Sequence, residues 1–258
     1  MSALLELEKV TIKFGGLTAV SEVDMQVGEH ELAGLIGPNG AGKTTVFNLI
    51  TGVYQPTSGR IDFRGKRTVG VKPHVLSLHG ISRTFQNVRL FAQMSVFDNV
   101  RTAMQGNRAQ GVRDALVRGE HFYAVEAKVE HEVIELLKIF GLDHLRDAWG
   151  KSLPYGDQRR LEIVRALATQ PKLLLLDEPA AGMNPTEKEE LMTLIRFVKD
   201  KFKISVLLVE HDMRVVMGIC EKITVLDYGK KIAEGTPQEV RNNPKVIAAY
   251  LGKDFDDA

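Results

Sequence analysis

Eight residues near the N-terminus have the types and spacing of a phosphate-binding loop. Residues 37–44, GPNGAGKT, fit the pattern G-x-x-x-x-G-K-[ST], and a predicted strand at residues 31–36 leads directly into them. The glycines let the chain curl until successive backbone N–H groups point at one anion, at the positive end of the following helix. Lys43 can then neutralise phosphate charge, and the Thr44 hydroxyl can bind Mg²⁺. The loop predicts a nucleoside-triphosphate site; a glycine turn before a helix is the alternative.

Two carboxylates follow a second apolar run. Four leucines at 173–176 predict a buried strand, and Asp177 and Glu178 come directly after it. The carboxyl edge of a parallel sheet is where α/β folds bind ligands. Asp177 would hold Mg²⁺ through its water shell, and Glu178 would orient and deprotonate an attacking water. The alternative is that both acids only cap the next element.

Two further polar residues could complete such a site. His211 follows a predicted strand at 205–209, and its imidazole could hydrogen-bond the terminal phosphate, although a structural role is the alternative. Gln86 could bridge Mg²⁺ and the attacking water, but an isolated glutamine is no evidence for this.

Composition and charge exclude several classes of function. The chain has 258 residues, a length that suits one α/β unit with insertions as well as two domains, and 34 basic residues nearly balance 33 acidic ones. The net charge of the chain therefore gives no reason to expect binding to nucleic acid or to an anionic membrane.

The single cysteine, Cys220, cannot form an intrachain disulfide, which fits a reducing compartment, and we expect it to pack in a helix. No signal peptide or membrane-spanning run is recognised, so membrane contact is expected through a partner.

Hydrophobic periodicity divides the chain into three parts. Residues 4–30 alternate around a glycine turn at 15–16, and a further short strand pair is expected around 59–63, so the first part predicts antiparallel strands. From about 97 to 149 the hydrophobic period is helical. Its clearest run predicts a helix that stops at Gly141, which would occupy the C′ position. We interpret this stretch as a helical insertion with a solvated surface, or alternatively a docking surface.

The last part alternates strands with helices. Predicted helices cover 158–169, 186–201 and 214–220, and predicted strands cover 173–176, 205–209 and 223–226. Such alternation predicts a parallel sheet with crossover helices, and the apolar strands suit a sheet buried on both faces. A turn at 228–229 leads into 231–233, and the acidic tail, 252–258, is expected to be mobile.

The order of these elements carries more information than any one of them. The chain presents them in this order: a phosphate loop, Gln86, a helical insertion, a glycine-bearing turn at 153–158, Asp177 with Glu178, and His211. This order resembles the ATPase subunits of ATP-binding cassette (ABC) transporters over nearly the whole chain. The resemblance implies an α/β P-loop NTPase fold with a mixed sheet core, an antiparallel β subdomain and an inserted helical subdomain at about 87–165. It also implies a single ATP-binding domain over 1–258, with ATP and Mg²⁺ as ligands.

The resemblance also assigns roles to individual residues. Phe14 stands where an aromatic stacks on adenine, although Val10 and Ile12 share its face and alone would make it a core residue. Gln86 matches the loop glutamine that links the nucleotide to the membrane partner. The implied catalytic residues are Glu178, His211, Lys43 and Gln86; the nucleotide-binding residues are Phe14, Gly37, Pro38, Asn39, Gly40, Ala41, Gly42, Lys43, Thr44, Thr45, Gln86 and, towards a partner's ATP, Gly156; the magnesium residues are Thr44, Gln86 and Asp177.

Two segments depart from the usual pattern of the family. The signature turn reads LPYGD at 153–157 in place of LSGGQ, so Pro154 lacks a hydroxyl and an N–H and Asp157 adds a carboxylate at a helix N-terminus. We expect the polar residues 158–160 to offset this acid. Asn184 replaces the aspartate that usually ends the loop after Glu178. These variants, with LEIVRAL at 161–167 and a closing YLG, resemble the branched-chain amino-acid importer branch; lipopolysaccharide-export and urea-import ATPases share much of the frame.

One phosphate loop and one signature turn imply that the ATP sites form between two chains. The family's head-to-tail dimer sandwiches two ATP molecules, and the altered signature favours a different ATPase subunit as partner. The resemblance also implies two transmembrane permeases and a periplasmic or extracellular solute-binding protein as partners, and no nucleic acid. It places the chain peripherally on the cytoplasmic face of the inner or plasma membrane. The rivals are a soluble ABC ATPase, which usually carries a long coiled coil or tandem cassettes, and a non-catalytic module, which would lack Lys43, Asp177 or Glu178.

Overall fold

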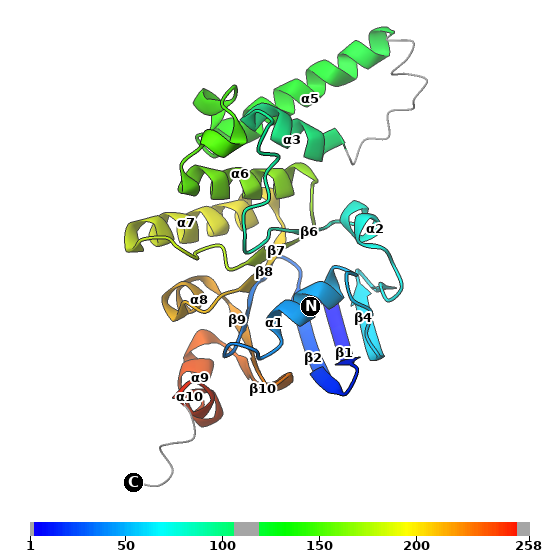
Figure 1. The fold of residues 1–258 in the computed structure, drawn as a ribbon, viewed down its shortest axis with the longest axis vertical. Coiled ribbons are helices and arrows are strands. Elements are labelled where there is room, and N and C mark those ends of the chain that lie inside the picture. The colour runs from blue at the N-terminus through cyan, green and yellow to red at the C-terminus, as the bar shows by residue number, and fades with distance from the viewer. Residues whose placement is uncertain (1–2, 106–118, 252–258) are drawn as a thin grey trace. The chain divides into compact units, whose positions relative to one another are not determined.

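The computed structural model describes residues 3–105 and 119–251, and the chain divides into two compact units. Unit 1 combines Met1–Arg83 with Lys172–Ala258, and unit 2 is Thr84–Pro171 (Figure 1). Among the described residues, no helix has the length and apolar character needed to cross a bilayer. The tail 252–258, predicted to be mobile, lies outside the described residues.

Unit 1 contains an antiparallel sheet, sheet A, with strand order β2-β1-β4-β5. Its long hairpin pairs Leu5 with Val27 and Phe14 with Leu17 across a turn in which Gly15 adopts a φ of 58°. The prediction of antiparallel strands in this part of the chain is confirmed. The strands are β1 (Ala3–Phe14), β2 (Leu17–Gly28), β4 (Ser58–Phe63) and β5 (Lys66–Arg67).

The second sheet of unit 1, sheet B, is mixed and has the order β10-β9-β3-β8-β7-β6. The pairs β9–β3, β3–β8, β8–β7 and β7–β6 are parallel, whereas β9 and β10 form an antiparallel hairpin. The edge strand β6 was not predicted, because three residues are too few to show a period. The strands are β3 (Leu32–Ile36), β6 (Ile81–Arg83), β7 (Leu173–Asp177), β8 (Ser205–Val209), β9 (Lys222–Asp227) and β10 (Lys230–Gly235).

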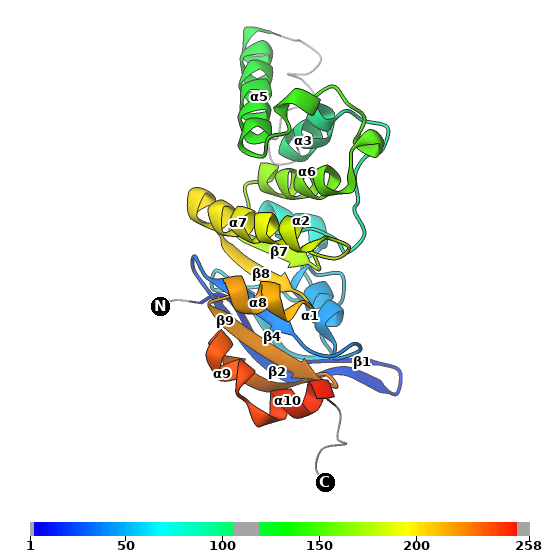
Figure 2. The same cartoon turned by 90° about the vertical axis from the view of Figure 1, so that its left-hand side faces the viewer.

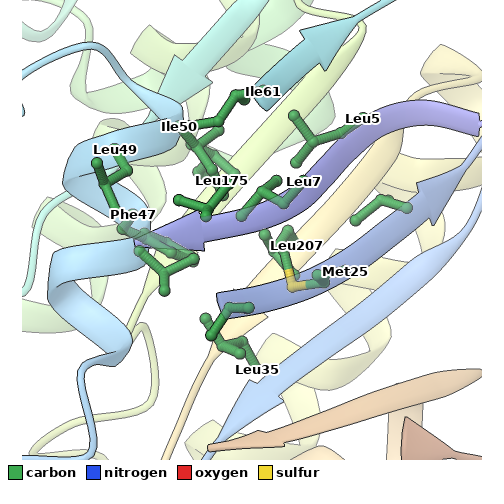
Figure 3. Packing of buried hydrophobic residues seen from close by; sticks show 14 of the residues in the cluster. Leu5, Leu7, Met25, Leu35, Phe47, Leu49, Ile50, Ile61, Leu175 and Leu207 are labelled. Atoms are coloured by element: carbon green, nitrogen blue, oxygen red, sulfur yellow. The ribbon is translucent and has the colours of Figure 1, made fainter. Parts of the chain in front are cut away.

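Helices cover both faces of sheet B, as its apolar strands require. Leu35, Leu175 and Leu207 point towards sheet A and pack with Phe47 of α1 (Figure 3). On the other face, a Cβ placed on Gly34 would meet Cys220 and Val216, and α7 and α8 cover this side (Figure 2). The helices of unit 1 are α1 (Lys43–Ile50), α2 (Pro73–Leu78), α7 (Pro185–Phe202), α8 (Met213–Ile219), α9 (Pro237–Arg241) and α10 (Pro244–Leu251).

Unit 2 is helical in its described residues. Helix α5 ends at the position predicted from periodicity, with Gly141 at a φ of 66° just after the C-cap. Helix α6 begins at Tyr155, three residues before the predicted start, because Pro154 stands at the N-cap and the expected glycine turn forms the first helical turn. The elements are α3 (Val96–Gln105), α5 (Glu120–Ile139), the 3₁₀ turns η1 (Asp143–Leu145) and η2 (Gly150–Ser152), and α6 (Tyr155–Ala168).

Candidate functional site

The predicted phosphate loop connects the end of β3 to the first turn of α1. Gly37 has a φ of 153° and Gly42 a φ of 98°. A Cβ on Gly37 would lie 2.1 Å from the carbonyl oxygen of Leu226, and one on Gly42 would lie 2.9 Å from that of Ala19. Both positions therefore require glycine for steric as well as conformational reasons. The resulting curl is the backbone conformation that presents N–H groups to an anion.

Lys43 is held inside this loop. Its Nζ donates to the carbonyl oxygens of Gly37 at 2.7 Å and Pro38 at 2.9 Å, and the residue is 7% exposed. Burial lowers the pKa of Lys43, while the nearby charges of Glu178 and Asp177 act in the opposite direction. The ammonium and both carboxylates are therefore close enough to interact at one edge of sheet B, the edge at which the sequence analysis expected the two acids.

Two elements far along the chain support the loop. The N–H of Gly229, in the β9–β10 turn, donates to Ala41 O at 3.1 Å, and the Ser21 N–H of β2 donates to Gly229 O at 2.8 Å. Burial raises the pKa of the Tyr250 hydroxyl on α10 to about 12, and the backbone of Gly37 acts in the opposite direction, so Tyr250 lies near the phosphate loop. Sequence reasoning used Tyr250 only as part of the closing YLG and gave it no place beside the phosphate loop, because neither α9 nor α10 was predicted.

Asp177 ends β7 and is fixed by an arginine that sequence reasoning also missed. Arg83 Nη2 lies 2.6 Å from Asp177 Oδ2, and the two side chains are only 8% and 7% exposed. The other guanidinium nitrogen, Nη1, donates to Asn48 Oδ1 at 2.7 Å, and Asn48 lies one helical turn after Thr44 on α1. Arg83 therefore connects the carboxylate to the helix that carries Thr44. The only sequence signal for this role of Arg83 was the position of a charged residue at the end of a short strand.

Glu178 follows in a left-handed conformation with a φ of 46°. Its N–H donates to Val209 O at 2.8 Å, which holds the residue at the end of β8. Its Oε2 lies 3.7 Å from Nδ1 of His211, and the two side chains are 19% and 59% exposed. A non-glycine residue in this region costs about 1–3 kcal/mol, which persists where the surroundings enforce it, as at active sites. The structure thus brings together two residues predicted to act on the same phosphate and water.

A buried carboxylate, Glu210, connects the segments around Glu178 and His211. Its side chain is fully buried and accepts from the N–H of Ala180 at 2.7 Å and of His211 at 3.2 Å. Burial raises the pKa of Glu210, and these backbone donors partly oppose the effect. Sequence reasoning noted this residue only as part of the strand end.

Phe14 lies at the tip of the β1–β2 hairpin rather than in the core. It is 44% exposed and meets Tyr54 edge to face, with ring centroids 5.2 Å apart. The core alternative suggested by Val10 and Ile12 is therefore wrong: β1 pairs with β4 only as far as Thr11, so the hairpin tip extends past the covering strand. An exposed aromatic face is available for a planar base.

Gln86 and Gly156 belong to unit 2, and their roles stay predictions. A Cβ on Gly156 would meet nothing within 4 Å, so the space beside this glycine is open. The expectation that the residues after Asp157 jointly offset its charge is wrong in one respect: Arg160 lies 3.7 Å from Asp157, whereas Arg159 is 3% exposed and points into the unit. In unit 1, Asn184 caps α7 in a capping box with Glu187.

The donor set fits Mg²⁺ bound together with a nucleotide. Among the described residues, no three His, Cys, Asp or Glu side chains gather into a metal site. Mg²⁺ does not need such a cage, since it usually keeps several waters and binds one or two carboxylates with substrate phosphates. The exposed Thr44 hydroxyl on the first turn of α1 and the Asp177 carboxylate are suitable oxygen donors.

Two family descriptions match the sequence. Residues 20–181 match the ABC transporter family, and residues 230–256 match the branched-chain amino acid ATP-binding cassette transporter family. The second match includes β10, α9 and the described part of α10, whose Tyr250 lies near the phosphate loop.

Curated relatives and solved structures agree with these matches. The high-affinity branched-chain amino acid transport ATP-binding protein LivG of Salmonella typhimurium is 44% identical, covering 97% of this chain and 98% of that protein. The lipopolysaccharide export system ATP-binding protein LptB of Escherichia coli is 34% identical, covering 98% and 99%. A crystal structure of the ADP conformation of an ATP-binding cassette of an ABC transporter has a TM-score of 0.84 at 30% identity, covering 98% of this chain and all of that one. The predicted ABC-ATPase fold is confirmed.

Proposed function

Because the chain belongs to the ABC transporter family, as one of its ATP-binding cassettes, we propose that it is the ATP-hydrolysing subunit of an importer of branched-chain or other hydrophobic amino acids. Both units together form the single ATP-binding domain over 1–258. The substrate class is supported by the 44% identity to LivG over nearly the full length and by the match of residues 230–256.

The observation that carries hydrolysis is the position of Glu178. Its carboxylate lies beside His211 and close enough to Lys43 to influence the ammonium charge. We infer that Lys43 neutralises β- and γ-phosphate charge, while Glu178 orients the attacking water and accepts its proton. His211 donates a hydrogen bond to the γ-phosphate. Phe14 stacks on adenine, and Gln86 senses the occupied site from unit 2.

Thr44 and Asp177 would hold Mg²⁺, Thr44 through its hydroxyl and Asp177 through water, with Gln86 as a further ligand. When bound, the ion would neutralise charge that develops on the phosphate oxygens. Arg83 and Asn48 hold the Asp177 carboxylate relative to α1, so this chain supplies a fixed oxygen donor.

We infer that two ATP sites form in a head-to-tail dimer, with Gly156 presenting its N–H to the partner's ATP. Pro154 and Asp157 weaken this half-site, which favours a different ATPase subunit as partner over a second copy. The γ-phosphate joins both half-sites and favours closure, and hydrolysis lets the dimer open. Two permeases receive this movement at the cytoplasmic face of the membrane, where the chain is peripheral, and a solute-binding protein delivers the substrate.

A second candidate function is lipopolysaccharide export, because LptB is 34% identical over 98% of this chain. The higher identity to LivG and the match at residues 230–256 favour amino-acid import. The two functions also differ in direction, since the importer needs a solute-binding protein outside the membrane.

Vesicles test the substrate class directly. The chain is expressed together with the proposed permeases and second ATPase subunit, and ATP-dependent uptake of radiolabelled leucine is measured with the solute-binding protein present. We expect uptake that requires ATP and is lost in Lys43→Ala, while Lys138→Ala on an exposed face of α5 transports normally. ATP hydrolysis without uptake of leucine, isoleucine or valine would contradict the amino-acid assignment and leave the ATPase assignment standing.

A further inference from the structure

The loop that carries Gln86 is bound to one helix of its own unit through backbone groups. Phe85 is held on both sides: its N–H donates to Glu162 Oε1 at 3.2 Å, and its carbonyl oxygen accepts from Arg159 Nη1 at 2.8 Å. Arg159 Nη2 donates to the carbonyl oxygen of Gln86 itself. The Gln86 side chain therefore extends from a backbone that α6 holds in place.

The far end of the loop is bound to the same helix. The Arg89 N–H donates to Glu162 Oε1 at 3.3 Å, and Arg165 donates to the Arg89 carbonyl oxygen. Arg159, Glu162 and Arg165 follow one another at intervals of three residues, so they lie along one side of α6. We call the Arg159–Glu162 pair, with its bonds to residues 85, 86 and 89, the loop clamp.

The loop clamp is buried, which makes it costly to form. The side chains of Arg159 and Glu162 are 4% and 6% exposed, and Arg159 Nη1 lies 3.2 Å from Glu162 Oε2. A third nitrogen, Arg159 Nε, donates to the Tyr155 hydroxyl at 3.0 Å. A buried ion pair is often no more stabilising than apolar residues of the same volume. Overall stability alone therefore explains poorly why these charges are placed against the loop backbone.

Both ends of this arrangement matter if the proposed function holds, and the inference rests on it. Helix α6 begins at Tyr155 and Gly156, the signature turn expected to meet the partner's ATP. We propose that Arg159 and Glu162 are positioning residues that fix the Gln86 loop to α6, so that the signature turn and Gln86 move as one piece. When ATP engages Gly156 and α6 shifts, Gln86 then moves by the same displacement as α6.

Steady-state ATP hydrolysis by the assembled transporter tests this proposal. Arg159→Lys keeps the charge and much of the length but loses the planar fork that bonds Phe85, Gln86 and Tyr155 together. We expect kcat to fall by about tenfold or more, since small misplacements cost up to about 10²-fold, while KM for ATP changes less than about twofold. Arg146→Lys, an exposed arginine of the same unit, serves as the matched control and should retain wild-type kcat.

A double-mutant cycle identifies the route by which Arg159 acts. In a Gln86→Ala background, Arg159→Lys should lower kcat less than twofold further, because both changes disable the same loop. Independent, multiplicative losses of kcat would overturn the proposal, as would a wild-type kcat in Arg159→Lys.

Hydrogen exchange of the isolated full chain tests the loop clamp without any assay of hydrolysis. Glu162→Gln replaces the charged acceptor of the Phe85 and Arg89 amides by a neutral amide oxygen. Their exchange should accelerate about tenfold, as expected when a hydrogen bond to a charged group becomes one to a neutral group. Glu135→Gln on exposed α5 is the control. Unchanged exchange at these two amides would overturn the proposal. If Arg159→Lys does not fold, this measurement decides alone. A wild-type transporter that hydrolyses no ATP would refute the proposed function, whereas an active wild type with an unaffected Arg159→Lys would refute only the loop clamp.

Discussion

Replacing Glu178 with glutamine tests its role as the general base while leaving the shape of the site nearly unchanged. Glutamine has nearly the same size, so it can keep the φ of 46° and the hydrogen bond from its N–H to Val209 O. The change removes the base that faces the attacking water, and a positioned general base contributes about 10²–10⁴-fold. We therefore expect kcat to fall by that factor, or about 3–5 kcal/mol of activation free energy.

The affinity for ATP should not fall in Glu178→Gln, although kcat does. The carboxylate lies near Lys43 and His211, so it also lies near the negative charge of a bound triphosphate. Removing one negative charge should leave the ATP affinity unchanged or higher. The assay pairs single-turnover hydrolysis with equilibrium binding of a fluorescent ATP analogue.

The matched control for this experiment is Glu189→Gln. Glu189 is a half-exposed carboxylate of unit 1 that pairs with Arg214 at 2.7 Å, and such surface pairs contribute about 0–1 kcal/mol. Its hydrolysis rate should equal that of the wild type. A Glu178→Gln protein that hydrolyses ATP at the wild-type rate would remove Glu178 from the mechanism, and loss of ATP binding with the fold intact would assign it a role in binding instead.

Three further predictions address the histidine, the base contact and the thiol. His211→Ala should impair hydrolysis with ATP binding largely retained, measured as kcat and Kd; loss of binding would indicate a structural role. Phe14→Ala should weaken ATP binding by about 1–3 kcal/mol, the usual value of one base–aromatic stack, whereas Phe14→Tyr should bind normally and an unchanged Kd in Phe14→Ala would exclude stacking. Burial raises the pKa of the Cys220 thiol to about 12, so iodoacetamide should label the native protein slowly, without the rise between pH 7 and 10 seen in urea. Because the unfolded thiol ionises at lower pH, the folded state loses stability as pH rises from about 9 towards 12, by up to about 1.4 kcal/mol per unit, an effect absent in Cys220→Ala.

The sequence was sufficient where a single local signal determined the structure. The phosphate loop was found because its glycines and lysine are consecutive, and β3, β7 and β8 because short apolar runs in a both-faces-buried sheet need no alternation. Helix α5 was found with its C-terminal end because its period runs through many residues and Gly141 stops it.

The rest depended on contacts between distant residues. The partners of Asp177 and Ala180 are Arg83 and Glu210, and neither polar residue shows a local pattern that names its partner. Phe14 was ambiguous because alternation gives the face of a strand but not how far the neighbouring strand covers it. The resemblance to a family, rather than periodicity, placed it correctly outside the core.

Light scattering of the Glu178→Gln chain, alone and mixed with its second ATPase subunit, tests the central claim most directly. The γ-phosphate should join two cassettes, and the blocked hydrolysis should preserve the joined state. In at least one of the two samples, we expect the mass of a dimer when ATP is present. The same sample should show the mass of separate subunits when ADP replaces ATP. Separate subunits with ATP in both samples would contradict the account.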